Sequence, residues 1–199
     1  MEAFEHVARV FLETQGYAVS TNVKFPVRRR TKKRAYEEYQ EHGYEVDLVA
    51  ARADELLLGS VKSYFGSFGL SRQFFRELSD ESKKKWWESN KLFNEPEVQA
   101  GVLSGAAERF SYPSASIFLG LFVGKFKPGD EADIRAHLGQ LRFGGGAVRL
   151  FDLPTIMRGV MTETKRKTYR DDPVIVALKC LDELGWIAPT VPQEHTPGN

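Results

Sequence analysis

A near-continuous apolar run from Ala115 to Phe126, ASIFLGLFVGKF, constrains the fold more than any other part of the chain. Successive apolar positions mean that a strand formed by this run is buried on both of its faces. Such strands occur at the centre of sheets that are covered by helices on both sides. The run therefore predicts a central strand in an α/β domain.

The segments nearest the N-terminus predict a helix followed by a strand. Apolar residues recur at helical spacing over residues 4–12, and Gly16 provides a natural stop. Residues 17–25 have the composition of a strand that ends at Pro26. Residues 27–42 form a charged excursion, which we interpret as either an extended hairpin or a loop.

Two further strand-like runs follow in quick succession, at residues 44–52 and 55–64. Only Ala53 and Asp54 separate them. So short a link between two strands favours an antiparallel hairpin.

The remaining segments alternate between helical and strand-like patterns. They predict helices over residues 74–92, 96–110, 130–141 and 173–184, and a strand over residues 147–153. The order predicts an α/β fold with a mixed central sheet flanked by helices. We expect a single domain over residues 1–189, with a core at about 2–126, a C-terminal strand and helices over 127–187, and a flexible tail over 190–199.

The composition restricts the compartment and the kind of site. Cys180 is the only cysteine, so it forms no internal disulfide and builds no zinc site by itself, which fits a reducing compartment. No apolar stretch is long enough to cross a bilayer, and the acidic N-terminal segment differs from the basic start of a secretory signal. We therefore expect a cytoplasmic protein with no membrane partner and oxygen ligands for any metal. The histidines, which we expect on the surface or in loops, are His6, His42, His137 and His195.

Polar side chains in the predicted hairpin indicate a site. Because side chains alternate along a strand, Ser60 and Lys62 share one face. Glu45, Asp47 and Val49 share a face of the partner strand. An antiparallel hairpin therefore brings Asp47 next to Ser60 and Lys62. A carboxylate and an ammonium group at the ends of adjacent strands can hold a divalent cation with a water beside it.

This arrangement resembles the PD-(D/E)xK nuclease superfamily. The resemblance rests on a helix ending in LETQGYAV, then GYEVDLVA, then a strand ending in SVKS, and it covers roughly residues 2–126. It implies a restriction-endonuclease-like fold, made of a helix, a three-stranded meander, a helix and a further strand. It also implies cleavage of DNA or RNA phosphodiesters with Mg²⁺, for which Mn²⁺ can substitute. By this resemblance Asp47 is the metal-binding aspartate, Lys62 is the motif lysine, and the backbone carbonyl of Val61 is a further metal ligand.

Ser60 departs from the family pattern. Most relatives have Glu or Asp there, and a neutral hydroxyl is a poor substitute for a carboxylate towards Mg²⁺. Either the site is inactive and the fold serves as a binding module, or the missing acid comes from the following helix, as the resemblance to one subgroup of restriction enzymes implies. On a helical wheel anchored at Phe74, Glu77 borders the apolar side and is the candidate acid. The alternative is that Glu77 is an ordinary surface glutamate.

The first helix offers a second candidate acid. Glu5 lies at the margin of its apolar face, and relatives often place a glutamate from this helix near the metal. The alternative for Glu5 is a first-turn glutamate favoured by the helix dipole. If the site is active, Asp47 with Glu77 or Glu5 holds one or two Mg²⁺ ions. Lys62 then orients the attacking water or stabilises the developing negative charge.

The basic residues are clustered although the net charge is only +1. The cluster RRRTKKR is expected to contact the nucleic-acid backbone through Arg28, Arg29, Arg30, Lys32, Lys33 and Arg34. Trp86 and Trp87 follow three lysines, where they either stack on bases or pack against the core. We expect a DNA endonuclease acting on double-stranded DNA, and cutting both strands would call for a homodimer. The rival interpretations are an inactive module that binds nucleic acid or a protein, and an unrelated α/β domain with a structural lysine.

Overall fold

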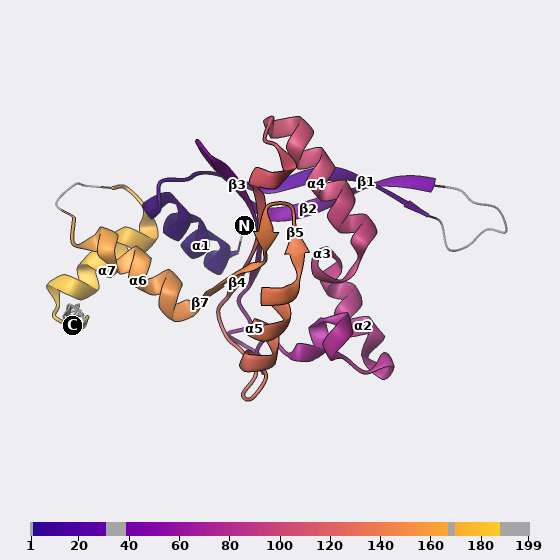
Figure 1. Ribbon diagram of the computed structural model, residues 1–199. Coiled ribbons are helices and arrows are strands. Elements are labelled where there is room, and N and C mark those ends of the chain that lie inside the picture. The colour runs from indigo at the N-terminus through magenta and orange to yellow at the C-terminus, as the bar shows by residue number, and fades with distance from the viewer. Residues whose placement is uncertain (1, 31–38, 167–169, 188–199) are drawn as a thin grey trace, which may run out of the picture.

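The computed structural model describes residues 2–30, 39–166 and 170–187, and a five-stranded sheet runs through its centre (Figure 1). In spatial order its strands are β1 (Ala18–Arg30), β2 (Tyr39–Arg52), β3 (Glu55–Lys62), β4 (Ile117–Val123) and β7 (Arg149–Asp152). The first three strands pair antiparallel, whereas β4 runs parallel to both β3 and β7. The α/β class with a mixed central sheet is therefore confirmed.

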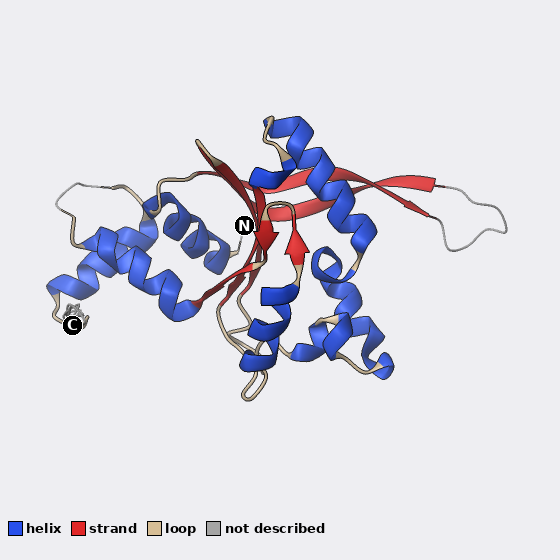
Figure 2. Ribbon diagram, in the orientation of Figure 1, coloured by secondary structure: helices blue, strands red, loops and turns tan. Residues whose placement is uncertain are grey.

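Helices cover both faces of this sheet (Figure 2). One face carries α1 (Ala3–Thr14), α6 (Leu153–Thr164) and α7 (Pro173–Glu183), and the other carries α2 (Lys84–Trp87), α3 (Lys91–Asn94), α4 (Pro96–Phe110) and α5 (Glu131–Gln140). A small hairpin of β5 (Arg142–Phe143) and β6 (Gly146–Ala147) follows α5. In the described ranges no helix combines the length and the apolar character needed to cross a membrane.

The strongest apolar patterns in the sequence form the core elements. Six of the seven residues of β4 are buried, as expected for a strand covered on both faces. The apolar stripe of α1 packs on one side of the sheet with Leu57, Val61 and Phe122. Leu56 and Leu58 point to the other side, towards α4 and α5. After Gly59 the side chains of β3 keep alternating: Val61 faces α1, whereas Ser60 and Lys62 face the side of α4 and α5.

The first hairpin extends past Pro26, where we expected the first strand to end. Strand β1 continues to Arg30 and pairs with β2 up to Tyr39, so the described residues of the charged excursion form an extended hairpin, one of its two interpretations. Proline has no N–H to donate, and it is tolerated here because β1 lies at the edge of the sheet. The hairpin projects beyond the body of the molecule (Figure 1). Its tip, residues 31–38, lies outside the described part of the chain, as does the predicted flexible tail at 190–199.

The prediction of one helix over residues 74–92 is wrong. The segment instead forms η1 (Arg72–Phe74), η2 (Arg76–Leu78), η3 (Glu81–Lys83), α2, η4 (Glu88–Asn90) and α3. Phe75 has an extended backbone between η1 and η2, with φ −112° and ψ 129°. The buried amide of Asn94 donates to the backbone carbonyls of Phe74, Trp87 and Asn90. A continuous helix would pair these carbonyls internally, so a tertiary contact holds the segment in short turns.

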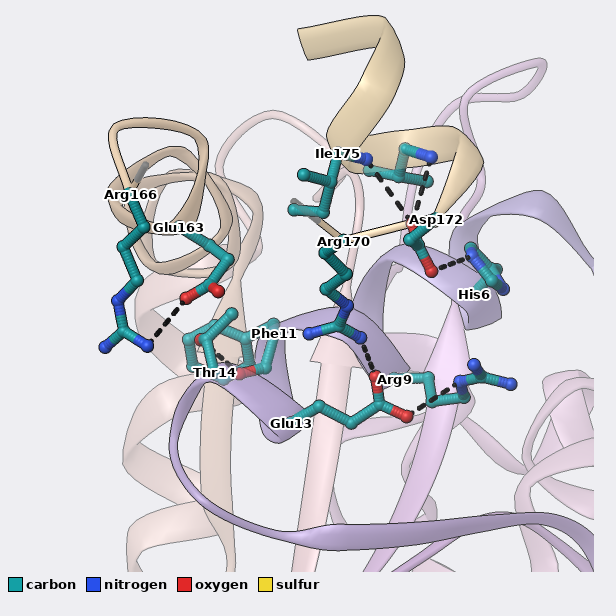
Figure 3. A network of polar contacts seen from close by, with 11 residues as sticks. His6, Arg9, Phe11, Glu13, Thr14, Glu163, Arg166, Arg170, Asp172 and Ile175 are labelled. Atoms are coloured by element: carbon teal, nitrogen blue, oxygen red, sulfur yellow. Dashed lines mark hydrogen bonds and ion pairs between the residues drawn. The ribbon is translucent and has the colours of Figure 1, made fainter. Parts of the chain in front are cut away.

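Helix α6 was not predicted, and it connects β7 to the C-terminal helix. Asp152 accepts a hydrogen bond from the Thr155 N–H at 2.9 Å and caps α6. Asp172 caps α7 through the N–H groups of Val174 and Ile175, and its other oxygen lies 3.0 Å from His6 Nε2 of α1 (Figure 3). This contact fixes α7 against the first helix, on the face of the sheet opposite α4.

Candidate functional site

The candidate site lies where the paired part of β2 and β3 ends. Their ladder stops at Leu48 opposite Gly59, so Asp47 and Ser60 are the next residues on each strand. Oδ2 of Asp47 accepts hydrogen bonds from Ser60 Oγ at 3.2 Å and from the Val61 N–H at 2.6 Å. The carboxylate thus binds a backbone group of β3 that lies beyond the ladder. The structure brings the side chains of Asp47 and Ser60 together, as the alternation of side chains suggested, whereas Val61 contacts Asp47 through its backbone N–H.

The sheet is distorted beside Asp47. Asn22, opposite Asp47 on β1, has φ 55°, in the left-handed region that asparagine tolerates. Val46 and Val49 both pack in the same core cluster, so the regular alternation of side chains is broken between them. We expected Glu45, Asp47 and Val49 to share a face of an undisturbed strand. Irregular strands of this kind are frequent next to functional sites, because they redirect a side chain.

Lys62 is the last residue of β3 and lies opposite Val123 of β4. Its side chain is half-buried and forms no ion pair or hydrogen bond with the described residues. Ser60 and Lys62 share a face of β3 with Leu58, which faces α4 and α5. Lys62 therefore places a positive charge on the same face of β3 as Ser60, and no described carboxylate neutralises it.

The half-buried phenol of Tyr44 lies within the electrostatic influence of Asp47 and of a second carboxylate, Glu95. The pKa of Tyr44 is raised to about 12, mainly by burial and to a lesser extent by the charges of Asp47 and Glu95, against a lowering hydrogen bond from the Leu92 backbone. Tyr44 is thus a neutral hydrogen-bonding group near both acids. Glu95 directly precedes α4 and forms an ion pair with Arg29 of β1. Sequence reasoning missed Tyr44 and Glu95, and the only signal was the Glu-Pro pair at a helix start.

The other two candidate acids make contacts elsewhere. Glu77 lies in η2 with a side chain that is 59% exposed, and its Oε2 is 3.7 Å from His137 Nε2 of α5. Glu5 accepts a hydrogen bond from the Glu2 N–H at 2.9 Å and forms part of the capping box of α1. Within the described ranges no three His, Cys, Asp or Glu residues form a group that could hold a metal ion.

The expectation that all histidines lie on the surface or in loops is wrong for two of them. His6 of α1 pairs with Asp172, and both side chains are largely covered. His137 is 12% exposed, and its ring centroid lies 5.4 Å from that of Phe75. His42 is exposed, in agreement with the expectation, and His195 lies outside the described residues. Contacts between elements distant in the sequence bury His6 and His137, which local spacing could not reveal.

The predicted nucleic-acid-binding residues follow the projecting hairpin. The Arg28 guanidinium lies 4.6 Å from the ring centroid of Tyr39, across the two strands. Arg29 pairs with Glu95, and Arg30 ends β1. Lys32, Lys33 and Arg34 lie outside the described residues.

A cavity of about 290 Å³ lies at the base of this hairpin. Its described lining comprises Val27, Arg29, His42, Gly43, Tyr44, Lys91 and Val98. Arg29, His42 and Lys91 are basic residue types, and Tyr44, whose pKa the charge of Asp47 helps to raise, also lines the cavity. Lys91 and Arg29, the latter paired with Glu95, thus place cationic side chains in the same cavity as Tyr44.

Comparisons with known proteins do not identify the chain. No family model matches it, and no curated protein matches it. A solved crystal structure described as a protein of unknown function, AF1548, is similar over 92% of this chain and 77% of its own, with 12% identity and a TM-score of 0.43. This similarity is too weak to indicate a family or an activity.

Proposed function

We propose that the protein is a metal-dependent nuclease of PD-(D/E)xK type that hydrolyses phosphodiester bonds in DNA. The observation that carries the proposal is the contact of the Asp47 carboxylate with Ser60 and Val61, followed directly by Lys62, whose ammonium group pairs with no carboxylate among the described residues. The order of α1, a three-stranded meander, α4 and β4 supports it, because the resembling superfamily has the same order.

The donor set fits a magnesium ion that is held partly by substrate. Oδ2 of Asp47 is occupied by two hydrogen bonds, whereas Oδ1 accepts none from the described residues. Mg²⁺ is commonly bound by one or two carboxylates together with waters and phosphate oxygens, rather than by an all-protein cage. Asp47 would hold the ion, together with the carbonyl of Val61 that the resemblance implies. When bound, the ion polarises the phosphate and lowers the pKa of a coordinated water.

The chain's own residues then have distinct roles. Ser60 and the Val61 N–H fix the orientation of the Asp47 carboxylate, so Ser60 is a positioning residue. Lys62 orients the attacking water or stabilises the negative charge that develops on the phosphate. The basic hairpin and the cavity at its base attract the phosphate backbone. A homodimer would supply the second active site that a double-strand cut requires.

Cleavage of plasmid and oligonucleotide DNA with Mg²⁺ or Mn²⁺ tests the proposal. We expect Asp47→Asn and Lys62→Gln each to lower the rate at least roughly 100-fold, the scale of losing one catalytic group. Glu77→Gln is the matched control, because Glu77 contacts His137. Cleavage that persists in both site variants would remove this site from the reaction. Loss of cleavage in Glu77→Gln would instead support Glu77 as a metal ligand.

A binding module without catalysis is the second candidate. Ser60 in place of an acid, and the lack of a three-ligand group among the described residues, favour it. Salt-dependent DNA binding with no cleavage in either metal would establish it. Calorimetry separates the two: the nuclease binds Mn²⁺ more tightly when uncleavable DNA is present, whereas the module binds DNA equally with and without the metal.

A further inference from the structure

A second pocket lies at the short turns that replace the predicted helix. It has a volume of about 460 Å³, and its described lining consists of Arg76, Ser79, Lys84 and Trp87. This volume is within the range of roughly 300–1,000 Å³ typical of small-molecule sites. The pocket combines two cationic side chains, a hydroxyl and an aromatic ring. None of these residues belongs to the site at Asp47.

The backbone around the pocket is held in place by Asn94. This side chain is 4% exposed, accepts a hydrogen bond from the Arg76 N–H at 2.8 Å and donates to the Trp87 carbonyl at 2.7 Å. One buried amide thus fixes both the turn that carries Arg76 and the helix that carries Trp87. The backbone positions of Arg76 and Trp87 are therefore fixed relative to each other, which lowers the entropic cost of binding a ligand between them.

The neighbouring tryptophans have different environments. The Trp86 ring centroid lies 5.4 Å from the centroids of Phe68 and Phe74, in an aromatic cluster. Trp87 instead lines the pocket, with the Arg76 guanidinium 5.4 Å from its ring centroid. Trp86 has a packing role, and Trp87 provides an aromatic surface next to a cation.

The charges of the pocket favour an anion. Arg76 has no carboxylate partner among the described residues. Lys84 lies 3.9 Å from Glu88, and both side chains are so exposed that this pair contributes little. An anionic ligand with a flat ring therefore fits both halves of the pocket: the ring lies against Trp87 and the anion between Arg76 and Lys84. A nucleotide has this combination of groups.

The pocket lies on the same side of the sheet as Ser60 and Lys62. The ring centroids of Tyr64, just after Lys62, and Phe74 are 5.4 Å apart, and Phe74 contacts Trp86, the neighbour of Trp87. Aromatic packing thus connects the end of β3 to the pocket. A strand that passes Lys62 can continue along this face of the molecule.

We propose that the pocket binds an unpaired nucleotide of a nucleic-acid strand, with the base stacked on Trp87 and its phosphate held by Arg76 and Lys84. The inference rests on the proposed function for its ligand class, and it adds a substrate-binding subsite. A base within a duplex has both faces covered, so only an unpaired or extruded base can stack on a side chain.

Fluorescence anisotropy with a labelled oligothymidine in EDTA tests the proposal without cleavage. We expect Trp87→Leu to weaken binding roughly 5- to 150-fold, the range for losing one base–aromatic stack. Trp87→Phe keeps an aromatic face and retains most of the affinity. The binding constant falls as the salt concentration rises, and Arg76→Gln should make the slope of log binding constant against log salt concentration shallower by about 0.7, the value for one phosphate contact on a single strand.

Matched controls are available on the opposite side of the sheet. Arg158→Gln removes a charge from α6, and Trp186→Phe alters a tryptophan that is 75% exposed; neither changes the affinity. Circular dichroism verifies that each variant is folded. Affinities of Trp87→Leu and Arg76→Gln within twofold of the wild type would overturn the proposal. Equal weakening for a blunt duplex would overturn the requirement for an unpaired base.

The outcome separates this inference from the proposed nuclease activity. Trp87-dependent binding in a protein that cuts no DNA with any metal keeps the subsite and removes the activity. Normal Asp47-dependent cleavage with unchanged binding in the Trp87 and Arg76 variants keeps the activity and removes the subsite.

Discussion

We expect acid to destabilise the protein through Glu55, the first residue of β3. The Arg149 guanidinium forms two hydrogen bonds of 2.8 Å with this buried carboxylate and, with a further hydrogen bond from Tyr17, holds its pKa at about 2 against the opposing effect of burial. The ordinary value is 4.5. The network stabilises the start of the strand that carries Ser60 and Lys62.

The magnitude follows from the difference between the two pKa values. A shift of 2.5 units, 4.5 minus 2, corresponds to about 3 kcal/mol at 1.36 kcal/mol per unit. Because the pKa is lowered in the folded state, this stabilisation is present above pH 4.5 and is lost as the pH falls towards 2. At pH 3 roughly 2 kcal/mol of it is already lost, since the unfolded state is then mostly protonated at this group.

Urea unfolding followed by circular dichroism, from pH 6 to pH 3, measures the effect in wild type and Glu55→Gln. The pKa values of Asp130 and Asp152 are also lowered, mainly by hydrogen bonds that outweigh their burial, so wild-type stability falls in acid for several reasons. Subtracting the free energy of unfolding of Glu55→Gln from that of the wild type at each pH isolates the contribution of Glu55. We expect the difference in free energy of unfolding to shrink by roughly 2 kcal/mol between pH 6 and pH 3. A difference that stays constant would refute the assignment of the lowered pKa to this ion pair.

Two further substitutions test the packing around the site. Gly59→Ala places a Cβ 2.8 Å from the Phe122 ring and should lower the free energy of unfolding by about 1–3 kcal/mol. Gly139→Ala, a control in α5 with open space around the new Cβ, should raise it by up to about 1 kcal/mol. Equal urea midpoints for the two variants would contradict this. Asp172→Ala removes the cap of α7 and the contact with His6 and should lower the unfolding free energy by at least about 1 kcal/mol, while Asp172→Asn, which keeps a capping oxygen, costs less. Equal losses in the two Asp172 variants would show that the cap contributes nothing.

The sequence allowed the central elements to be predicted because their signal is local. The apolar run of β4 and the stripe of α1 specify burial directly, and the two-residue link after β2 specifies an antiparallel pair. The contact between Asp47 and Ser60 could also be predicted, because it needs only that pairing and the alternation of side chains. These features depend on residues that are close in the chain.

The remaining features depend on contacts between distant segments. The short turns of residues 72–94 exist because Asn94 binds carbonyls that a helix would otherwise pair internally. Strand β1 can continue past Pro26 because β1 is the edge strand of the sheet, and the order of strands in a sheet cannot be predicted from the local sequence. Glu95 affects Tyr44 only because α4 packs against β1, where Glu95 pairs with Arg29, and β1 is the neighbour of β2. No local pattern encodes such pairings, so sequence reasoning placed the candidate acid at Glu77.

Ser60 has a physical role that its neutral side chain did not suggest. A carboxylate at this position would stand close to Asp47, where Ser60 Oγ is 3.2 Å from Oδ2, and two like charges at that distance require either a shared proton or a cation between them. The hydroxyl instead donates a hydrogen bond and orients the carboxylate without any cation. A site of this kind offers one protein ligand fewer to a metal ion than the family pattern with an acid at this position. If the protein cleaves DNA, the substrate phosphate must therefore supply much of the metal affinity, which couples metal binding to substrate binding.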